Sequence, residues 1–335
     1  EELLAPRDKL AASILRMGGL LLYGREHLQS VQSQPVSEDD HKPLTLTQKI
    51  LARHVVRTSH TSGDLIPGQG AFVRADWRYI IEAYTGMAGH MMHATFGRPL
   101  KLVDLPSIIG FAEHASYISH HPKYLFPAKA PVGMRVMHDT HDAFMKEYGI
   151  RSHGYLPGSG GSEGICHPLM AEKYALPGQV LVGTDSHTPH SGALGCLAFG
   201  VGTTDMASAM LTGAARLTVP ETLRIEFNGD VPAGITGKDL ALSLLANPKI
   251  RSGLGLGKVF EFAGTSIRHL SIDERATLTN MVAELGGFAG IVEPDEKTCE
   301  FLRARRGVDF TLEPWMKSDQ GASYSDTIVV DTSEL

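Results

Sequence analysis

Short apolar runs separated by glycine, proline and polar residues recur along the chain, and their periods predict both helices and strands. Thr45-Leu-Thr-Gln48 is a capping box, in which two side chains satisfy the first free amides of a helix. Ser271 and Glu274 form a second capping box. The predicted helices span 45–54, 141–150, 167–176, 203–213, 235–247 and 271–288. Residues 72–84 are predicted to form a strand and a turn. Further strands are predicted within 101–111, 179–185, 222–232 and 258–264.

Strands and helices alternate throughout, which is the pattern of an α/β fold. The pattern changes near residue 220, where proline separates a helical stretch from a regularly alternating strand. We therefore predict two α/β domains, one over residues 44–221 and one over residues 222–335. Residues 1–43 are predicted to be an N-terminal extension and linker.

The N-terminal extension divides into two parts. Residues 1–30 place Leu10, Ile14 and Leu15 at helical spacing, which predicts one amphipathic helix. Residues 30–43 are polar and contain proline, as a linker does. The order of charged, apolar and cleavage regions that marks a secretory signal does not occur here.

Composition narrows the function classes. A chain of 335 residues, 42% of them hydrophobic, can bury the cores of two domains. The net charge of −6 gives no basic surface, so we expect no nucleic-acid partner. The negative net charge does not exclude small anionic substrates, because a single site can be positive on an acidic protein. No run of eighteen apolar residues occurs, so no membrane span is predicted.

The three cysteines argue against a disulfide framework. Cys166, Cys196 and Cys299 are odd in number and far apart, and no two form a C-x-x-C pair. We expect each to be a small buried apolar residue in a reducing compartment. The predicted location is the cytoplasm, with an organelle matrix as the alternative.

Histidines crowd into one part of the chain. Eleven of the sixteen lie between His90 and His190. Imidazole is the side chain most easily poised for proton transfer near neutral pH, and it is also a common metal ligand. This crowding favours a functional site in the first domain.

Asp185, Ser186 and His187 stand together where a predicted strand ends and glycines begin. Ligands bind at the carboxyl ends of strands in open α/β sheets, so this stretch is a candidate site. The structural alternative is an Asx-turn, in which Asp185 bonds the backbone after it. A serine hydrolase would need G-x-S-x-G, which is missing. The following glycines also do not match the dinucleotide fingerprint.

Several longer stretches resemble the aconitase superfamily, in particular its isopropylmalate dehydratase-type large subunits. They are TLTQKILARH, GICHPLMAEKYALPGQVLVGTDSHTPHSGALG, FGVGTTDMASAMLTG, PETLRIEFNGDVPAGITGKDL and TLTNMVAELGGFAGIVEPDE, in the family's order over about residues 44–300. The resemblance implies two α/β domains of a core that normally has three. It also implies a hydro-lyase of amino-acid biosynthesis that dehydrates and rehydrates hydroxy di- or tricarboxylates with a [4Fe-4S] cluster.

The resemblance also implies roles for single residues. His167, Asp185, Ser186 and His187 match catalytic positions that line the site and engage the cluster-bound substrate. Glu284 would hydrogen-bond a site histidine, unless it lies on a solvated helix face.

Two further positions are assigned to substrate binding by the same resemblance. Asn280 belongs with Glu284 to the family's N-x-x-x-E, one helical turn apart on one face. His190 stands where aconitases proper have asparagine.

The sequence also departs from the family pattern. The family's Asp-His pair has its nearest counterpart in Glu113-His114, which we include among the catalytic residues. Near residues 83–85 the family has His-Asp or Gln-Asp before a threonine, and this chain has neither. Arg74 and Arg78 are expected to serve in surface or interface pairing.

No metal ligand is assigned to this chain. In the family the cluster is bound by cysteines of a third domain, which would follow Leu335, so we expect the ligands outside this sequence. A small subunit or a C-terminal swivelling domain would supply a serine base and carboxylate-binding arginines.

Two alternatives stay open. The chain could be a non-catalytic aconitase-fold binding or assembly subunit without a cluster. It could also be a cluster-free lyase whose single metal is held by histidines and carboxylates, such as those of His138-Asp-Thr-His-Asp142.

Overall fold

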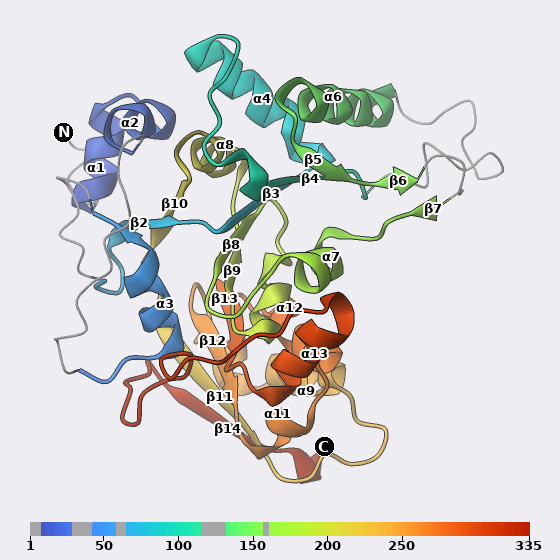
Figure 1. Cartoon of the computed structure of the whole chain (residues 1–335). Coiled ribbons are helices and arrows are strands. Elements are labelled where there is room, and N and C mark those ends of the chain that lie inside the picture. The colour runs from blue at the N-terminus through green and yellow to red at the C-terminus, as the bar shows by residue number, and fades with distance from the viewer. Residues whose placement is uncertain (1–7, 29–41, 58–64, 115–131, 157–160) are drawn as a thin grey trace.

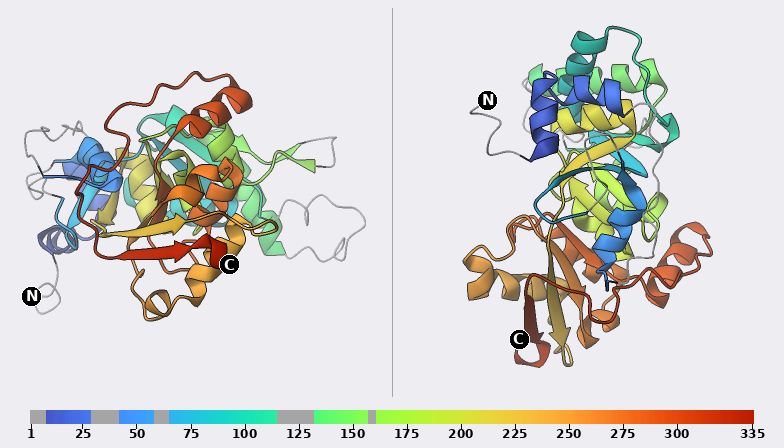
Figure 2. Two further views of the ribbon diagram at one scale, coloured as in Figure 1. Left: turned by 90° about the horizontal axis from the view of Figure 1, so that it is seen from below. Right: turned by 90° about the vertical axis from the view of Figure 1, so that its left-hand side faces the viewer.

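The computed structural model describes residues 8–28, 42–57, 65–114, 132–156 and 161–335. The chain forms two α/β lobes, with the first sheet in the upper half of Figure 1 and the second in the lower half. Figure 2 shows the two lobes stacked along the long dimension of the molecule. The predicted α/β fold class is confirmed.

The first lobe is built on a five-stranded parallel sheet of order β5-β4-β3-β8-β9. Its strands are β3 (Trp77–Ile81), β4 (Ile108–Phe111), β5 (Arg151–His153), β8 (Val180–Gly183) and β9 (Leu197–Gly200). Its helices are α4 (Glu82–Phe96), α6 (Val132–Tyr148), α7 (Cys166–Lys173) and α8 (Thr203–Thr212). Because side chains alternate along a strand, Ile80 packs with α4, α6 and α8, whereas Tyr79 and Ile81 pack with α7.

A small antiparallel sheet of order β1-β2-β10 extends the first lobe. Its strands are β1 (Val55–Val56), β2 (Gly70–Arg74) and β10 (Ala214–Thr218), and helix α3 (Leu46–His54) precedes it. The capping box of α3 forms as predicted, with Thr45 and Gln48 bonding each other's backbone amides.

The N-terminal segment packs against this small sheet. Helices α1 (Lys9–Arg16) and α2 (Leu20–His27) bury Leu10 and Tyr23 against Phe72 of β2. The single helix predicted over 1–30 is wrong, because Gly18 and Gly19 adopt positive φ of 85° and 121° and separate two helices. The predicted linker over 30–43 lies almost wholly outside the described residues.

The second lobe has a four-stranded parallel sheet of order β13-β12-β11-β14. Its strands are β11 (Thr222–Asn228), β12 (Val259–Ala263), β13 (Ala289–Val292) and β14 (Thr327–Asp331). Its helices are α9 (Gly237–Ala246), α10 (Pro248–Arg251), α11 (Thr265–His269), α12 (Ile272–Asn280) and α13 (Glu296–Arg306). The remaining short elements are the hairpin β6 (Tyr155–Leu156) and β7 (Gly161–Ser162) and the 3₁₀ turns η1 (Leu105–Ser107), η2 (Thr188–Leu194) and η3 (Thr332–Glu334).

Two element predictions need correction. Helix α4 begins at Glu82, where only a strand and a turn are predicted, and it starts without a side-chain cap. Helix α12 ends at Asn280 rather than 288, and hydrogen-bonded turns follow up to Gly286. Tertiary packing outweighs the local sequence pattern at both places: a helix forms from Glu82 where none is predicted, and the predicted helix ends early at Asn280.

Arg78 contradicts its predicted surface or interface role. Its side chain is fully buried, and its guanidinium donates to the carbonyl oxygens of Ala209 at 2.9 Å and Asp104 at 3.0 Å. Burial lowers the pKa of Arg78 to about 10, despite the nearby Asp104 carboxylate. Arg78 therefore joins β3 to α8 and to the turn before β4. Arg74, by contrast, is exposed.

The two lobes meet at a close backbone contact between η2 and β13. A Cβ atom added at Gly192 of η2 would overlap the carbonyl oxygen of Gly290. A Cβ at Gly195 would press against the ring of Pro294. Only glycine at position 192 lets the backbones approach this closely.

A substitution tests this contact. We expect Gly192→Ala to lower the free energy of unfolding by at least about 2 kcal/mol, since backbone must move to admit the methyl group. Gly133→Ala is the control, because nothing lies within 4 Å of a Cβ there and α6 gains a helix former. Urea unfolding of both variants is the measurement, and equal stabilities would contradict the contact.

Candidate functional site

The candidate site lies at the carboxyl ends of the first sheet, where it faces the second lobe. Asp185, Ser186 and His187 follow β8, and Glu113 and His114 follow β4. The other predicted residues are His167 at the start of α7, His190 in η2, Asn280 at the end of α12, and Glu284 in the turns after it. The structure brings all nine predicted residues into one connected set.

The turn after β8 is held by its own hydrogen bonds. The His187 amide donates to Asp185 Oδ1 at 2.8 Å, which is the Asx-turn expected as the structural alternative. The Thr188 hydroxyl donates to the Asp185 carbonyl at 2.6 Å. The turn thus fixes the backbone, and Asp185 Oδ2 and the His187 ring are still available for other contacts.

Asp185 is the centre of the site. His167 Nε2 lies 3.0 Å from Asp185 Oδ1, and His114 Nε2 lies 3.2 Å from Oδ2. Burial by itself would raise the pKa of Asp185, but hydrogen bonds from His114, His167 and the His187 amide outweigh it. The pKa is therefore held far below its usual range, and the carboxylate stays ionised.

His114 bridges two carboxylates. Its Nε2 faces Asp185, and its Nδ1 lies 3.4 Å from Oε1 of the buried Glu113. Both ring nitrogens can donate only in the imidazolium form, so this arrangement favours a charged ring. The hydrogen bond to Asp185 is the main cause that raises the pKa of His114.

Glu113 itself is anchored from behind. Its Oε2 accepts a short hydrogen bond from the Cys166 amide at the start of α7. Burial is the main cause that raises the pKa of Glu113, although the contacts with Cys166, His114 and His167 act against it. The chain thus offers a partly desolvated acid next to an imidazole whose pKa is raised.

His187 joins the two lobes. Its Nε2 lies 2.8 Å from Oε1 of Glu284, and its Nδ1 lies 3.1 Å from the Ser186 hydroxyl. Glu284 therefore engages a site histidine, as the family resemblance implies. The His187 side chain is 34% exposed and the Glu284 side chain 44%, so a small molecule can reach this pair.

His190 and Asn280 form a further contact between the two lobes. Asn280 Nδ2 lies 3.3 Å from His190 Nδ1, and the Thr279 hydroxyl donates to the His190 carbonyl at 3.0 Å. Burial, followed by repulsion from His167 and His187, lowers the pKa of His190 to about 4, so this ring is neutral at pH 7. The predicted helical relation between Asn280 and Glu284 is wrong, because α12 ends between them.

Glu82 is a site neighbour that the sequence did not reveal. It begins α4 directly after β3, between the ends of β4 and β8, and it is 1% exposed. Its Oε2 accepts from the Glu113 amide at 3.2 Å. The sequence does contain a signal for Glu82, since an acid directly after an apolar strand of a parallel sheet lies at the ligand-binding edge.

The described residues do not form a metal or cluster site. Within these ranges no three His, Cys, Asp or Glu side chains are placed to hold a metal ion together. Cys166, Cys196 and Cys299 are buried apart from one another, and burial raises the pKa of each thiol. Buried, protonated thiols do not fit a [4Fe-4S] cluster, which thiolates bind.

The alternative single-metal site has one free ring nitrogen, His138 Nε2, but within the described ranges no three ligand side chains there are placed to hold a metal ion together. His141 is fully buried, with Nδ1 2.8 Å from the Thr85 hydroxyl and Nε2 3.1 Å from the Ser152 hydroxyl. Both of its nitrogens are therefore engaged by hydroxyl groups. His141 ties α6 to α4 and β5 and does not face the candidate site.

The opposite pKa shifts of two histidines can be measured. We expect His190 to titrate near pH 4 and His114 above its ordinary value of about 6.5. The His114 contacts stabilise the fold below pH 6.5 or so and lose that effect as the pH rises through the folded-state pKa. Asp185→Asn should lower the His114 pKa, because the largest raising contact disappears.

Long-range ¹⁵N–¹H spectra over a pH series give both values. His269, which is exposed in the second lobe, serves as the reference ring. Equal titration of His114 and His190 would contradict the charge assignment.

Comparison with known proteins shows which family the sequence matches. The model of the aconitase family (aconitate hydratase) matches residues 123–335. The "probable 3-isopropylmalate dehydratase large subunit" of Methanosarcina mazei is 42% identical over 193 residues, which are 57% of this chain and 44% of that protein. The chloroplastic 3-isopropylmalate dehydratase large subunit of Arabidopsis thaliana is 32% identical over 297 residues, or 87% of this chain and 55% of that protein.

The chain spans about half the length of the curated relatives it matches. Among solved structures, the holo-form of aconitase X from Thermococcus kodakaraensis aligns with 78% of this chain and 58% of its own, at a TM-score of 0.41 and 12% identity. No helix of the described residues is long and apolar enough to cross a bilayer. The family match extends over more than half of the sequence, and the chain therefore belongs to the aconitase family.

Proposed function

We propose that this chain supplies histidine and carboxylate side chains to the active site of a hydro-lyase of the 3-isopropylmalate dehydratase large-subunit type. The substrate would be a hydroxy di- or tricarboxylate that is dehydrated and rehydrated. The observation that carries this proposal is the connected set of His114, His167 and His187 around Asp185, with Glu284 reaching in from the second lobe.

The reaction sets two chemical demands on the protein. A hydroxyl group leaves only after it is protonated or polarised, and a base must take a proton beside a carboxylate. The His187–Glu284 pair is suited to the first demand, because a carboxylate at 2.8 Å holds the ring in a fixed orientation for proton transfer. We assign leaving-group protonation to this pair, with Ser186 as the hydroxyl that fixes the other ring nitrogen.

Binding the substrate carboxylates requires positive charge among several acids. His114 meets this need, since its contacts with Asp185 and Glu113 favour the imidazolium form and its side chain is 47% exposed. Neutral His190, together with Asn280, can hydrogen-bond the substrate without adding charge. His167 is then a positioning residue, which holds Asp185 from the α7 side.

A [4Fe-4S] cluster is part of this proposal on the strength of family membership. When bound, it would act as the Lewis acid at the leaving hydroxyl. The cysteines of this chain do not fit as its ligands, so we assign the ligands to residues outside this sequence. A small subunit or swivelling domain would add the proton-abstracting base and carboxylate-binding arginines.

Substitutions at the lobe junction test the proposal. With the partner subunit present and iron and sulfide reconstituted anaerobically, we expect His187→Ala to lower the hydration rate of unsaturated dicarboxylates by about 10²-fold or more. Glu284→Gln should cause a smaller loss, because the amide still contacts the ring. His269→Ala, a histidine exposed in the second lobe, should retain full activity.

The outcomes separate the two function classes. Wild-type turnover that survives in His187→Ala would remove this pair from the reaction. A complex that assembles and binds the cluster but never turns over any hydroxy acid would favour the binding or assembly subunit instead.

A further inference from the structure

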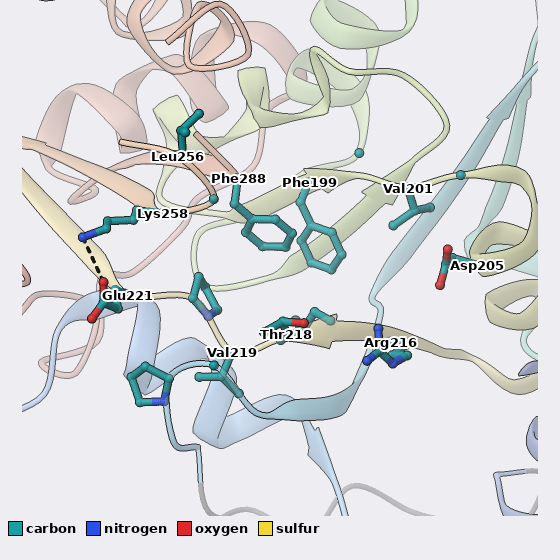
Figure 3. A pocket seen from close by; sticks show the side chains of 17 residues that line it. Phe199, Val201, Asp205, Arg216, Thr218, Val219, Glu221, Leu256, Lys258 and Phe288 are labelled. Carbon is teal, nitrogen blue, oxygen red and sulfur yellow. Dashed lines mark ion pairs between the residues drawn. The ribbon is translucent and has the colours of Figure 1, made fainter. Parts of the chain in front are cut away.

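A cavity of about 660 Å³ lies at the seam between the two lobes (Figure 3). The first lobe contributes β10 and the loop from β9 into α8, and the second contributes residues 256–258 and Phe288. None of the described residues that line it belongs to the candidate site. Its size is that of a pocket for a small organic molecule.

The two ends of this seam cavity differ in charge pairing. At one end, Lys258 Nζ and a carboxylate oxygen of Glu221 form an ion pair at 2.9 Å, so these charges are satisfied (Figure 3). At the other end, Asp205 and Arg216 face each other, but no ion pair of 4 Å or less joins them in the described part of the chain. Asp205 and Arg216 therefore form the polar end that a ligand could bridge.

The two groups of this polar end are only partly compensated, since Asp205 has the first-turn backbone of α8 beside it but no ion pair within 4 Å in the described part of the chain. Arg216 has one long contact, 3.5 Å from Nη2 to Asp8 Oδ2, and the rest of its five-donor guanidinium has no other hydrogen-bond partner recorded among the described residues. Burial raises the pKa of Asp205 even though Arg216 acts against it. A desolvated carboxylate without a close cation is unfavourable, and a bound cation would relieve it.

The middle of the cavity is apolar. The rings of Phe199 and Phe288 stack with centroids 4.8 Å apart, one from each lobe, and Val219 lies across from them (Figure 3). Leu256 stands at the same cavity with 68% of its surface exposed, which is high for leucine. Phe199 is fully buried behind Phe288, so the partly exposed Phe288 ring and Leu256 offer the apolar surface on which a group can pack.

We infer that the seam cavity binds an α-amino acid with a large apolar side chain. Its ammonium group would pair with Asp205 and its carboxylate with Arg216, while the side chain would lie against Phe288. An α-amino acid carries an ammonium group and a carboxylate on the same carbon. These two groups can pair at once with Asp205 and Arg216, which face each other without forming an ion pair. A simple anion would be repelled by the Asp205 carboxylate, and a simple amine would be repelled by the Arg216 guanidinium.

The cavity also borders the backbone that supports the candidate site. Val201, which lines the cavity, donates its amide to the Gly183 carbonyl at 2.8 Å. A Cβ at Gly200 would overlap the Asp185 carbonyl oxygen, so this strand packs directly behind the Asp185 turn. A ligand in the seam would thus contact both lobes and the strand beneath Asp185.

Calorimetric titration of the full chain tests the inference with L-phenylalanine as the probe. Two analogues each lack one charge: 3-phenylpropionate has no ammonium group, and 2-phenylethylamine has no carboxylate. We expect each analogue to bind about tenfold more weakly or worse, which corresponds to one lost charge-assisted hydrogen bond. Arg216→Gln and Asp205→Asn should weaken L-phenylalanine by a similar factor.

Asp8→Asn is the matched control. It removes the Arg216–Asp8 contact but leaves the cavity charges in place, and asparagine still caps α1. We expect this variant to bind L-phenylalanine as the wild type does.

Three results would overturn the inference. One is the absence of binding up to about 10 mM, which is weaker than a specific site provides. The second is an equal affinity for 3-phenylpropionate, which would make the cavity a carboxylate site only. The third is unchanged binding in both cavity variants. The readout is binding, so it does not depend on the proposed hydro-lyase activity.

Discussion

The approach of η2 to β13 is the constraint on which the site depends. Two backbones pass each other at Gly192 and Gly290 with no room for a side chain. This contact brings the turn after β8 against the end of α12, so that His187 and Glu284 meet at 2.8 Å. Neither lobe contains a complete site, because the first holds all four imidazoles and the second holds the carboxylate that orients one of them.

Charge distribution inside the site follows from small differences in surroundings. His114 lies between two carboxylates and is driven towards the charged form, whereas His190 is partly buried beside two other imidazoles and is driven towards the neutral form. Asp185 stays ionised because three donors converge on it. Packing thus shifts the pKa values of two histidines of one chain in opposite directions.

Local signals predicted the elements whose ends are set by their own residues. The capping boxes at Thr45 and Ser271 gave correct helix starts, because capping involves residues only three apart. The end of α12 was not predictable in this way, since it depends on packing against the other lobe. The break at Gly18 was visible in the sequence, but a strong apolar spacing masked it.

The site was predicted better as a set of residues than as a geometry. Family motifs pointed to Asp185, His187 and Glu284, and the parallel sheet explains why Glu113-His114 joins them. Glu82 was missed because its role comes from the order of strands β4-β3-β8, which one sequence does not reveal. Arg78 was misjudged for the same reason, since its three acceptor groups come from distant segments.

A second connection between the lobes lies far from the site. Residues near the end of the chain cap the start of α3: the Leu44 amide donates to Asp319 at 2.9 Å, the Leu46 amide to the Ser318 hydroxyl at 2.8 Å, and Lys49 pairs with Asp319 at 2.5 Å. The two lobes are therefore joined twice, once by the chain segment after β10 and once by these contacts at the start of α3. A cut near residue 221 would leave two fragments still held by the cap, so the units that fold need not coincide with the units that the sequence pattern delimits.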